Sequence, residues 1–391
     1  MEDPAAPEFL QMKGEGPITS GRPEGFTGWP AVPAPQPVAV TDDEGRITRV
    51  RTPVHELDGL ITPNRLFYAV QHFGVPDAVD RDAWELSIEG SASHPVRLTY
   101  AQLRSLPGHT VRTVMECSGS DAKFFDYVEG KGERPSRARE GMILSAGEFS
   151  GVSLSTILEL AGLKDGAAWV MAEGWDTGVP SNAPPGQAPF NYAKALPLEK
   201  AQHPDTILAW AMNGEPLDHL HGAPVRLIVP GWAGNWSVKW LRRLEIRELE
   251  PDLWYHYRFY YYGKSPDDPE RELITSLGVK SIVCDPADDG PLIPVGPYLI
   301  RGLAWSGESP ISLVELSFDE GQTWQEATIE EPRERWMWAR WWYKWHADRP
   351  GRYRILSRAK DAVGRVQRAE PRHNVMQKNF DAMVPCEVTV E

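Results

Sequence analysis

The chain has 391 residues, of which 41% are hydrophobic and 25% are charged, the composition of a globular protein long enough to bury a core without disulfides. Its formal net charge of −14, from 55 acidic against 41 basic residues, argues against a nonspecific nucleic-acid binder and against docking on an anionic membrane. No apolar run approaches the roughly 18 residues of a membrane span, and three cysteines without a CxxC spacing exclude a disulfide framework, a zinc ribbon and c-type haem attachment.

The first 58 residues are predicted to form an extended N-terminal arm, because the first 40 are rich in proline and glycine and hold no long apolar run. They contain neither a basic segment followed by an apolar one nor a twin arginine. The chain as given is therefore expected in the cytoplasm, and the periplasm is the alternative if a signal has been removed.

Residues 59–270 are predicted to form a domain of mixed strands and helices. Side-chain patterns predict strands over 84–90 and 111–117, and Thr99 is a plausible N-cap for a helix over 99–106. Because no regular strand–helix–strand repeat is present, the predicted class is α+β. The same domain is expected to contain a helix over 153–163 and strands over 223–231 and 238–249.

A polar, proline-rich and acidic segment at 263–272 is the best candidate for a linker, and the pattern after it changes to all-β. The tripeptide DEG at 319–321 lies between two alternating runs, which predicts a hairpin. Residues 271–391 are therefore predicted to form an immunoglobulin-like β-sandwich. Its expected strands lie within 298–305, 311–329, 337–345 and 351–364.

Aromatic residues are unusually dense in one of these strands. The chain has 16 tryptophans, several of them in the run WMWARWWYKW at 336–345. Large core and interface residues are the ordinary interpretation. Because large apolar residues fall on both faces of this strand, one face is expected to fill the sandwich core and the other to meet a partner in a homodimer.

Cys117 is the first candidate for chemistry. It ends a predicted strand and precedes a turn of small residues, Ser118 to Ser120, which could expose its sulfur to a ligand. One thiolate could anchor one soft metal. The alternative is a buried, inert cysteine, and this is the expectation for Cys284 and Cys386.

The second candidate stretch, at 221–246, combines glycines with donors. Gly231 and Gly234 allow the backbone to approach a bound group closely. Such a loop suits a phosphate or a polar heterocycle, although glycines and tryptophans before a strand could be pure packing. Its donors are His221, Arg226, Ser237 and Lys239. The third candidate is His72, which lies between aromatic residues and a Gly-Val-Pro turn and could equally be structural.

The chain contains no G-x-S-x-G, Walker A, H-E-x-x-H or G-x-G-x-x-G motif. The candidate stretches, read in order, instead resemble the sulfite oxidase family of molybdenum enzymes, over about residues 59–380. The pieces that carry the resemblance are TPNRLFYAVQHFGVP, ECSG, AEGWD, LAWAMNGEPL, HGAPVRLIVPG and GNWSVKWLRRLEI, followed by GLAWSG and ELSFDEGQTWQEA.

The resemblance implies a fold, a cofactor and a set of site residues. The fold would be an α+β domain that binds molybdenum through molybdopterin, followed by an immunoglobulin-like domain that commonly dimerises. Cys117 matches the cysteine whose thiolate ligates molybdenum, and Tyr261 matches an active-site tyrosine near the metal. The positions that match cofactor contacts are Tyr68, His72, Asp176, His221, Arg226, Ser237, Val238 and Lys239.

The chain departs from this family where sulfite oxidases usually carry arginines beside the metal. The matching segments here read VQH at 70–72, CSGSDA at 117–122, and Trp236 before SVK. We therefore expect sulfite to bind weakly and Trp236→Arg to improve its binding, since each charge-assisted hydrogen bond contributes roughly 1.5–3 kcal/mol. The segment before SVK resembles the sulfane-dehydrogenase branch. Arg340 and the basic run at 134–139 are the candidates to supply charge from elsewhere.

The predicted function is oxygen-atom transfer to or from a small sulfur compound by a molybdenum-cofactor oxidoreductase. With no haem motif in the chain, the electrons are expected to pass to an external acceptor such as a cytochrome. Two alternatives stay open: a reductase of an oxo-substrate, and a non-catalytic two-domain scaffold with a vestigial cofactor pocket.

Overall fold

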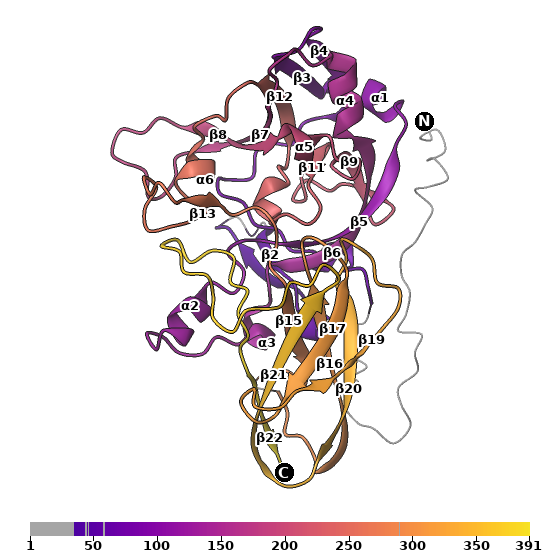
Figure 1. Cartoon of the computed structure of the whole chain (residues 1–391). Helices are drawn as coiled ribbons and strands as arrows, with labels where there is room; N and C mark the ends of the chain where they lie inside the picture. Colours follow the sequence, from indigo (N-terminus) through magenta and orange to yellow (C-terminus); the bar gives the residue numbers. More distant parts are fainter. Residues whose placement is uncertain (1–34, 44, 46, 58, 289) are drawn as a thin grey trace.

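The computed structural model describes residues 35–391 except 44, 46, 58 and 289. An α+β domain packs on a β-sandwich, with the sandwich at the bottom of the view in Figure 1. The predicted fold class is confirmed. The part of the predicted arm at 1–34 lies outside the described residues, and the rest is not simply extended, because β1 (Val38–Thr41) and β2 (Ile47–Arg51) pair as a hairpin.

The first domain is built on two five-stranded sheets. One is ordered β10-β9-β6-β5, with β11 added beside β9, and the other is ordered β4-β3-β12-β7-β8. All pairs in both sheets are antiparallel except β12 with β3. The strands of the first sheet are β5 (His109–Glu116), β6 (Leu144–Ser153), β9 (Ile207–Met212), β10 (Glu215–Pro216) and β11 (Arg226–Ile228). Those of the second are β3 (Glu85–Gly90), β4 (Val96–Thr99), β7 (Trp169–Gly178), β8 (Phe190–Pro197) and β12 (Leu241–Arg247).

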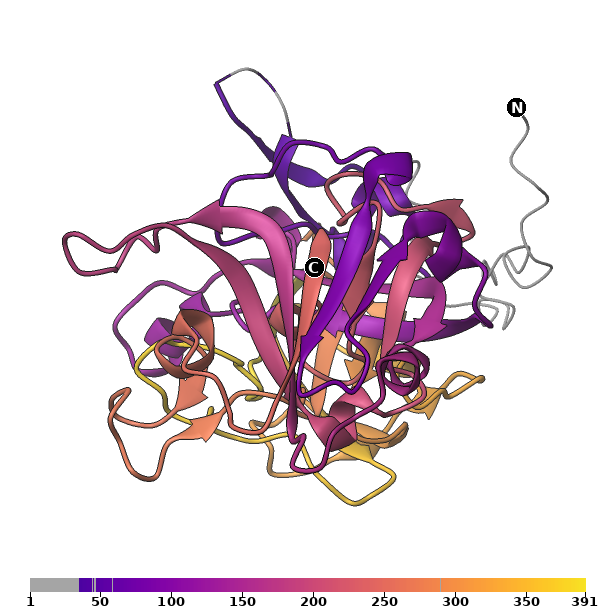
Figure 2. The same cartoon turned by 90° about the horizontal axis from the view of Figure 1, so that it is seen from above.

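The two sheets share one hydrophobic core, because apolar side chains from both are buried against each other. Leu86 and Leu244 come from the second sheet, and Val152 and Leu208 from the first. Seen from above, the loop that joins β7 and β8 projects away from this core (Figure 2).

Short helices connect the strands. The predicted cap is confirmed at α1, where Thr99 forms a capping box with Gln102. The α-helices are α1 (Tyr100–Arg104), α2 (Lys123–Val128), α3 (Arg137–Glu140), α4 (Leu154–Ala161), α5 (Leu198–Ala201) and α6 (Trp254–Tyr257). The 3-10 turns are Val54–Glu56, Asn64–Leu66, Arg81–Ala83 and Gly234–Trp236. Within the described residues, no helix is long and apolar enough to cross a membrane.

The second domain is a sandwich of two four-stranded sheets, ordered β15-β16-β20-β19 and β18-β17-β21-β22. The predicted hairpin around 319–321 is confirmed by the pairing of β17 with β18. Its strands are β15 (Lys280–Asp285), β16 (Gly296–Trp305), β17 (Ile311–Ser317), β18 (Gln325–Glu326), β19 (Thr328–Ile329), β20 (Ala339–Ala347), β21 (Gly351–Asp361) and β22 (Cys386–Val390). A small pair, β13 (Tyr261–Tyr262) and β14 (Glu272–Leu273), precedes it.

The aromatic run at 336–345 is divided between two tasks. Trp341 and Trp345 fill the sandwich core. Trp336 and Trp338 contact the first domain: the indole N–H of Trp336 donates to Asp205, and that of Trp338 donates to the Leu60 carbonyl. Trp336 and Trp338, which the sequence predicted to meet a second chain, therefore contact the first domain of the same chain.

Candidate functional site

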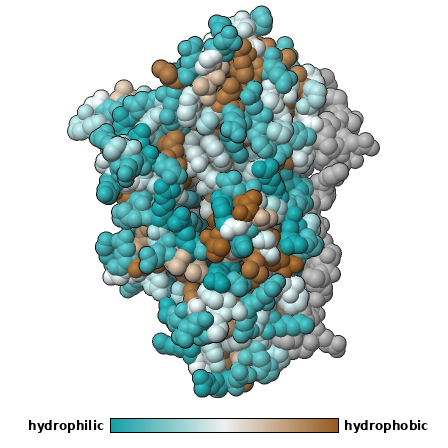
Figure 3. All heavy atoms as spheres, viewed as in Figure 1, coloured by the Kyte–Doolittle hydropathy of each residue, from teal (hydrophilic) through white to brown (hydrophobic). Residues whose placement is uncertain are grey.

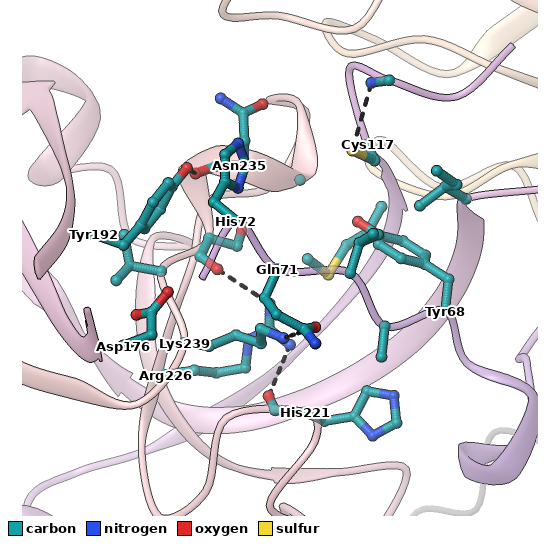
Figure 4. Close-up of a pocket in the computed structure, with 18 of the residues that line it drawn as sticks. Tyr68, Gln71, His72, Cys117, Asp176, Tyr192, His221, Arg226, Asn235 and Lys239 are labelled. Carbon is teal, nitrogen blue, oxygen red and sulfur yellow. Dashed lines mark hydrogen bonds between the residues drawn. The ribbon is translucent and has the colours of Figure 1, made fainter. Parts of the chain in front are cut away.

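A cavity of about 230 Å³ is lined mostly by residues of the first domain, and we call it the central cavity. Figure 4 shows the side chains that point into it, from the 67–72 segment, the turn after β5, strands β7 and β8, and the 220–239 region. Every cofactor-binding residue predicted from the sequence lines this cavity: Tyr68, His72, Asp176, His221, Arg226, Ser237, Val238 and Lys239. Cys117 lines it as well.

Cys117 is held by the turn that follows β5. Its backbone N–H donates to the Ile143 carbonyl at 2.9 Å, and its carbonyl accepts from the Ser120 N–H at 2.8 Å. The Gly119 N–H points at the sulfur, with 3.4 Å between N and Sγ. Burial raises the pKa of the thiol, and this N–H acts against the rise. The turn therefore presents the sulfur to the cavity in a defined direction.

Arg226 is buried in the cavity wall and is held by two backbone carbonyls, those of His221 at 2.9 Å and Ser237 at 3.1 Å. His221 is fixed in turn, since its Nδ1 lies 2.8 Å from Asp218 Oδ2 and its Nε2 lies 3.1 Å from the Phe67 carbonyl. The Ser237 hydroxyl accepts from the Val229 N–H. Backbone carbonyls therefore hold the Arg226 guanidinium at the cavity wall, and no carboxylate forms an ion pair with it among the described residues.

Asp176 and Lys239 add one acid and one base to the same side. Burial raises the pKa of Asp176 to about 6, although Lys239 opposes the rise. Burial, together with Arg226, lowers the pKa of Lys239 to about 7. The Lys239 ammonium donates to the Leu220 carbonyl at 3.2 Å. Both groups are thus poised to change charge or to pair when a polar ligand enters.

Gly234 is required by the shape of this wall. A Cβ at Gly234 would lie 2.1 Å from the hydroxyl oxygen of Tyr68, so any larger residue would push the tyrosine out of place. The neighbouring Asn235 is fixed through its carbonyl, which accepts from the Tyr192 hydroxyl at 2.7 Å, and through its Oδ1, which accepts from the Ser118 hydroxyl at 2.9 Å. The wall that carries Asn235 is therefore tied directly to the cysteine turn.

A tyrosine does line the cavity near the predicted position, but it is Tyr260 and not Tyr261. Tyr261 belongs to β13, is buried, and pairs with Leu273. The Tyr260 hydroxyl lies 2.6 Å from His72 Nε2. Burial lowers the pKa of His72 to about 3 and raises that of Tyr260 well above its ordinary value. Hence a protonated phenol and a neutral imidazole share this hydrogen bond.

Lys378 is a site residue that sequence reasoning missed. It comes from the C-terminal segment before β22, yet it lines the central cavity. Burial lowers its pKa, and the Cys117 thiolate acts in the opposite direction. No local pattern around 378 marks it, since only the tertiary fold brings this segment to the cysteine.

The structure corrects the expectations about Trp236, Arg340 and the basic run, and it also places Asp121. Trp236 is fully buried, and its indole N–H donates to the Ile274 carbonyl, so it does not line the cavity. Asp121 pairs with Arg137 at 2.8 Å, outside the cavity. Arg340 pairs with Glu330 in the second domain. The basic run at 134–139 is committed to ion pairs through Arg134 with Asp288 and through Arg137.

The residues present fit the molybdopterin cofactor that the sequence resemblance implies. Two buried donors in the cavity wall, Arg226 Nε and Asn235 Nδ2, find no acceptor among the described residues. An unpaired buried donor costs about 1–3 kcal/mol, so such atoms favour a ligand that brings acceptors. The cavity also has three cationic side chains, Arg226, Lys239 and Lys378, against one carboxyl group, Asp176. This charge suits an anionic group with a phosphate.

Comparisons with known proteins agree with this fit. Residues 72–255 match the family model "Oxidoreductase molybdopterin binding domain", and 271–388 match "Mo-co oxidoreductase dimerisation domain". The chain is 34% identical to mitochondrial sulfite oxidase of Rattus norvegicus, over 74% of this chain and 54% of the rat enzyme. It is 33% identical to sulfite oxidase of Gallus gallus, over 78% of this chain and 68% of that enzyme.

More distant relatives widen the range of chemistry. A nitrate reductase of Phaseolus vulgaris is 31% identical over 72% of this chain and 34% of its own length. Among solved structures, the sulfane dehydrogenase SoxCD from Paracoccus pantotrophus matches with a TM-score of 0.76 and 27% identity, over 96% of this chain and 98% of that chain. The chain spans about half the length of the first mammalian relatives that it matches.

Proposed function

Because this chain belongs to the sulfite oxidase family of molybdopterin-binding oxidoreductases, we propose that it oxidises a small sulfur compound by transfer of an oxygen atom. In the overall reaction the sulfur gains one oxygen from water, and two protons and two electrons are released. The observation that carries the proposal is the central cavity, where Cys117 lies on one side and Asp176, Arg226 and Lys239 lie on the other (Figure 4).

The molybdenum cofactor, when bound, supplies the two-electron oxygen-atom transfer that side chains cannot provide. The chain contributes ligation and position. Cys117 offers a thiolate, the protein ligand that a soft metal prefers. Arg226 and Lys239 hold anionic and carbonyl acceptors of the pterin, and His221 and Ser237 keep Arg226 in place through their carbonyls. Asp176 accepts from pterin N–H donors.

Tyr260, His72 and Lys378 act on the substrate side in this proposal. The Tyr260 phenol, 2.6 Å from the Nε2 of neutral His72, keeps a fixed hydroxyl group at the cavity wall. Lys378 supplies positive charge that attracts an anionic sulfur compound. A fixed hydroxyl group and a single ammonium give orientation without the several arginines that a doubly charged anion favours. The proposed substrates are therefore sulfur compounds of low charge density, such as those with sulfane sulfur, ahead of sulfite.

The proposal extends to partners. The electrons would leave one at a time to an external acceptor such as a cytochrome. The second domain would join two copies of the chain, which is the role named by the family model that matches 271–388.

A non-catalytic scaffold is the weaker alternative, because a scaffold gains nothing from unpaired buried donors beside a held cysteine. A reductase of an oxo-substrate would use the same residues in the opposite direction, and the similarity to nitrate reductases keeps this as the second candidate.

Steady-state oxidation with ferricyanide as acceptor tests the proposal on the molybdenum-loaded protein. Sulfite and the persulfide of a small uncharged thiol, which carries a sulfane sulfur and a single negative charge, are compared across a concentration series, with Cys117→Ser as the inactive control. We expect oxidation of a sulfane-sulfur substrate, with sulfite saturating only at much higher concentration. Loaded protein that oxidises neither compound would refute the proposed direction, and saturation at micromolar sulfite would refute the proposed substrate preference.

A further inference from the structure

Four charged side chains that are buried or nearly so form a chain of ion pairs directly behind the cysteine turn. The Lys280 ammonium lies 2.7 Å from Glu116 Oε1 and 2.9 Å from Asp121 Oδ2. Arg137 continues the series with a bond of 2.8 Å to Asp121. The signs alternate along the series, so two positive charges balance two negative ones. Neither Glu116 nor Asp121 lines the central cavity.

The two carboxylates of this series flank Cys117 in the sequence. Glu116 immediately precedes Cys117, and Asp121 follows it by four residues. Lys280 therefore forms ion pairs with a carboxylate on each side of the proposed metal ligand. Asp121 has a φ of 58°, in the left-handed region, so the turn is held in a conformation that a free loop would rarely adopt.

Lys280, which pairs with both carboxylates, comes from the second domain. Lys280 begins β15, and Trp305, which ends β16, donates its indole N–H to Glu116 Oε2 at 2.9 Å. A third contact comes from the C-terminal segment, where the Asn379 N–H donates to the Ser118 carbonyl at 2.6 Å. Three separate segments of the second domain thus reach the same short turn.

Buried ion pairs of this kind add little net stability, because desolvation offsets the attraction. Their directional contacts do fix the geometry of the groups they join, since any other arrangement leaves a buried charge unpaired. We therefore expect these ion pairs to contribute mainly to the position of the cysteine turn and little to the free energy of unfolding.

We propose that Lys280 and Trp305 are positioning residues for Cys117, so that the second domain sets the geometry of the metal ligand in addition to joining two chains. The inference rests on the proposed function, because it assumes that Cys117 binds molybdenum. It adds a role for the second domain that its dimerisation name does not include.

Two variants separate positioning from simple stability. Trp305→Phe keeps an aromatic ring and removes the N–H that holds Glu116, together with part of the buried indole, and thermal melting measures that loss of packing separately. Lys280→Met keeps the length of the side chain and removes the charge between Glu116 and Asp121. Lys360→Met is the matched control, since Lys360 is an exposed lysine in β21 of the same domain.

The readout is X-ray absorption at the molybdenum edge of the purified holoenzymes, with thermal melting recorded in parallel. Wild type and Lys360→Met should show three sulfur neighbours, two from the cofactor and one from Cys117. We expect Trp305→Phe to lengthen or broaden the shell of the third sulfur, and Lys280→Met to lose it in a large fraction of the molecules, with a fall in kcat of tenfold or more.

The outcomes are distinguishable. If wild type holds no molybdenum, the proposed function fails. If wild type shows three sulfurs and both variants keep an unchanged sulfur shell while only their melting temperature falls, the network is structural and the positioning inference is wrong. Should Lys280→Met fail to fold, the sulfur shell of Trp305→Phe decides alone.

Discussion

Positive charge reaches the central cavity from two separate parts of the fold, in a chain whose net charge is −14. Arg226 and Lys239 come from the 220–239 region that binds the pterin in the proposed function, whereas Lys378 arrives from the C-terminal segment. This division suggests separate duties, with the first two facing the cofactor and the third facing the substrate.

The variant Lys378→Met tests whether Lys378 binds the substrate. Loss of one charge-assisted contact, about 1.5–3 kcal/mol, should raise KM for an anionic sulfur substrate about 10- to 100-fold and leave the molybdenum content unchanged. Raising the salt concentration should weaken binding in wild type more than in the variant, because salt screens the ammonium. Steady-state kinetics at two ionic strengths measure both effects, with Lys360→Met as control. An unchanged KM would assign substrate binding to other groups.

Buried histidines make the stability depend on pH. His256 is fully buried, lies 2.8 Å from Glu250, and has its pKa lowered by burial to about 4, below the ordinary value of about 6.5. Between these values the unfolded chain binds more protons than the folded one. The stabilisation is therefore complete above pH 6.5 and is lost as the pH falls toward 4.

His256→Gln should flatten this dependence by up to about 1.4 kcal/mol per pH unit within that window. Glutamine can still donate to Glu250, so the packing is largely kept. Denaturant unfolding at a series of pH values measures the slope, and the exposed His94→Gln is the control. A slope in His256→Gln that equals the wild-type slope would show that His256 is not a buried neutral group.

At the scale of elements, the parts that the sequence predicted best are those with local signals. The capping box formed by Thr99 and Gln102 marks the start of α1, and the strand predicted to end at Cys117 ends one residue earlier, at Glu116. The strand expected over 223–231 is shorter, Arg226–Ile228, because Pro224 and Pro230 lack the N–H that a ladder needs. β6 was missed altogether, since both of its faces are buried and glycines interrupt it, so no alternation is visible.

The glycines of β6 are required by close packing. A Cβ at Gly151 would lie 2.2 Å from the Leu208 carbonyl oxygen and 2.8 Å from the Ala209 Cα, so neighbouring backbone would have to move. We expect Gly151→Ala to destabilise the protein by about 3 kcal/mol, the upper end for overpacking. Gly74→Ala, with no atom within 4 Å of the added Cβ, is the control and should change stability by less than about 0.5 kcal/mol. Equal unfolding midpoints for the two variants would contradict this packing.

The candidate site could be predicted where its residues lie in local sequence motifs. Cys117, His221 and Arg226 lie in contiguous motifs, so the sequence alone placed them at the cavity. Tyr260 could not be told from Tyr261, because a run of three tyrosines does not reveal which one turns toward the cavity. Lys378 was invisible because only long-range folding joins it to Cys117.

For the whole molecule, the remaining question is how two chains meet. The face viewed in Figure 3 is mostly hydrophilic with scattered hydrophobic spots, as the acidic composition indicates. On β20 the outward positions alternate with the core residues Trp341 and Trp345, which leaves Trp342 as the one large apolar side chain on the outer face of this strand in the described structure.

We predict a homodimer joined through the second domain, as the aromatic strand and the matched dimerisation model both favour. Sedimentation velocity at micromolar concentration should give about twice the mass of the chain. Trp342→Glu places a charge on the outer face of β20 and should shift the equilibrium toward monomer, whereas Lys360→Met should not. A wild-type monomer at these concentrations would rule the dimer out.

The central claim is that the cavity holds molybdenum through Cys117, and metal analysis tests it most directly. Purified wild type should contain about one molybdenum and one molybdopterin per chain. Cys117→Ser, which replaces a soft thiolate with a harder and weaker ligand, should keep the fold, hold less molybdenum than wild type and lose activity. Wild type without molybdenum after expression in a cofactor-producing host, or a serine variant with full metal content and activity, would contradict the account.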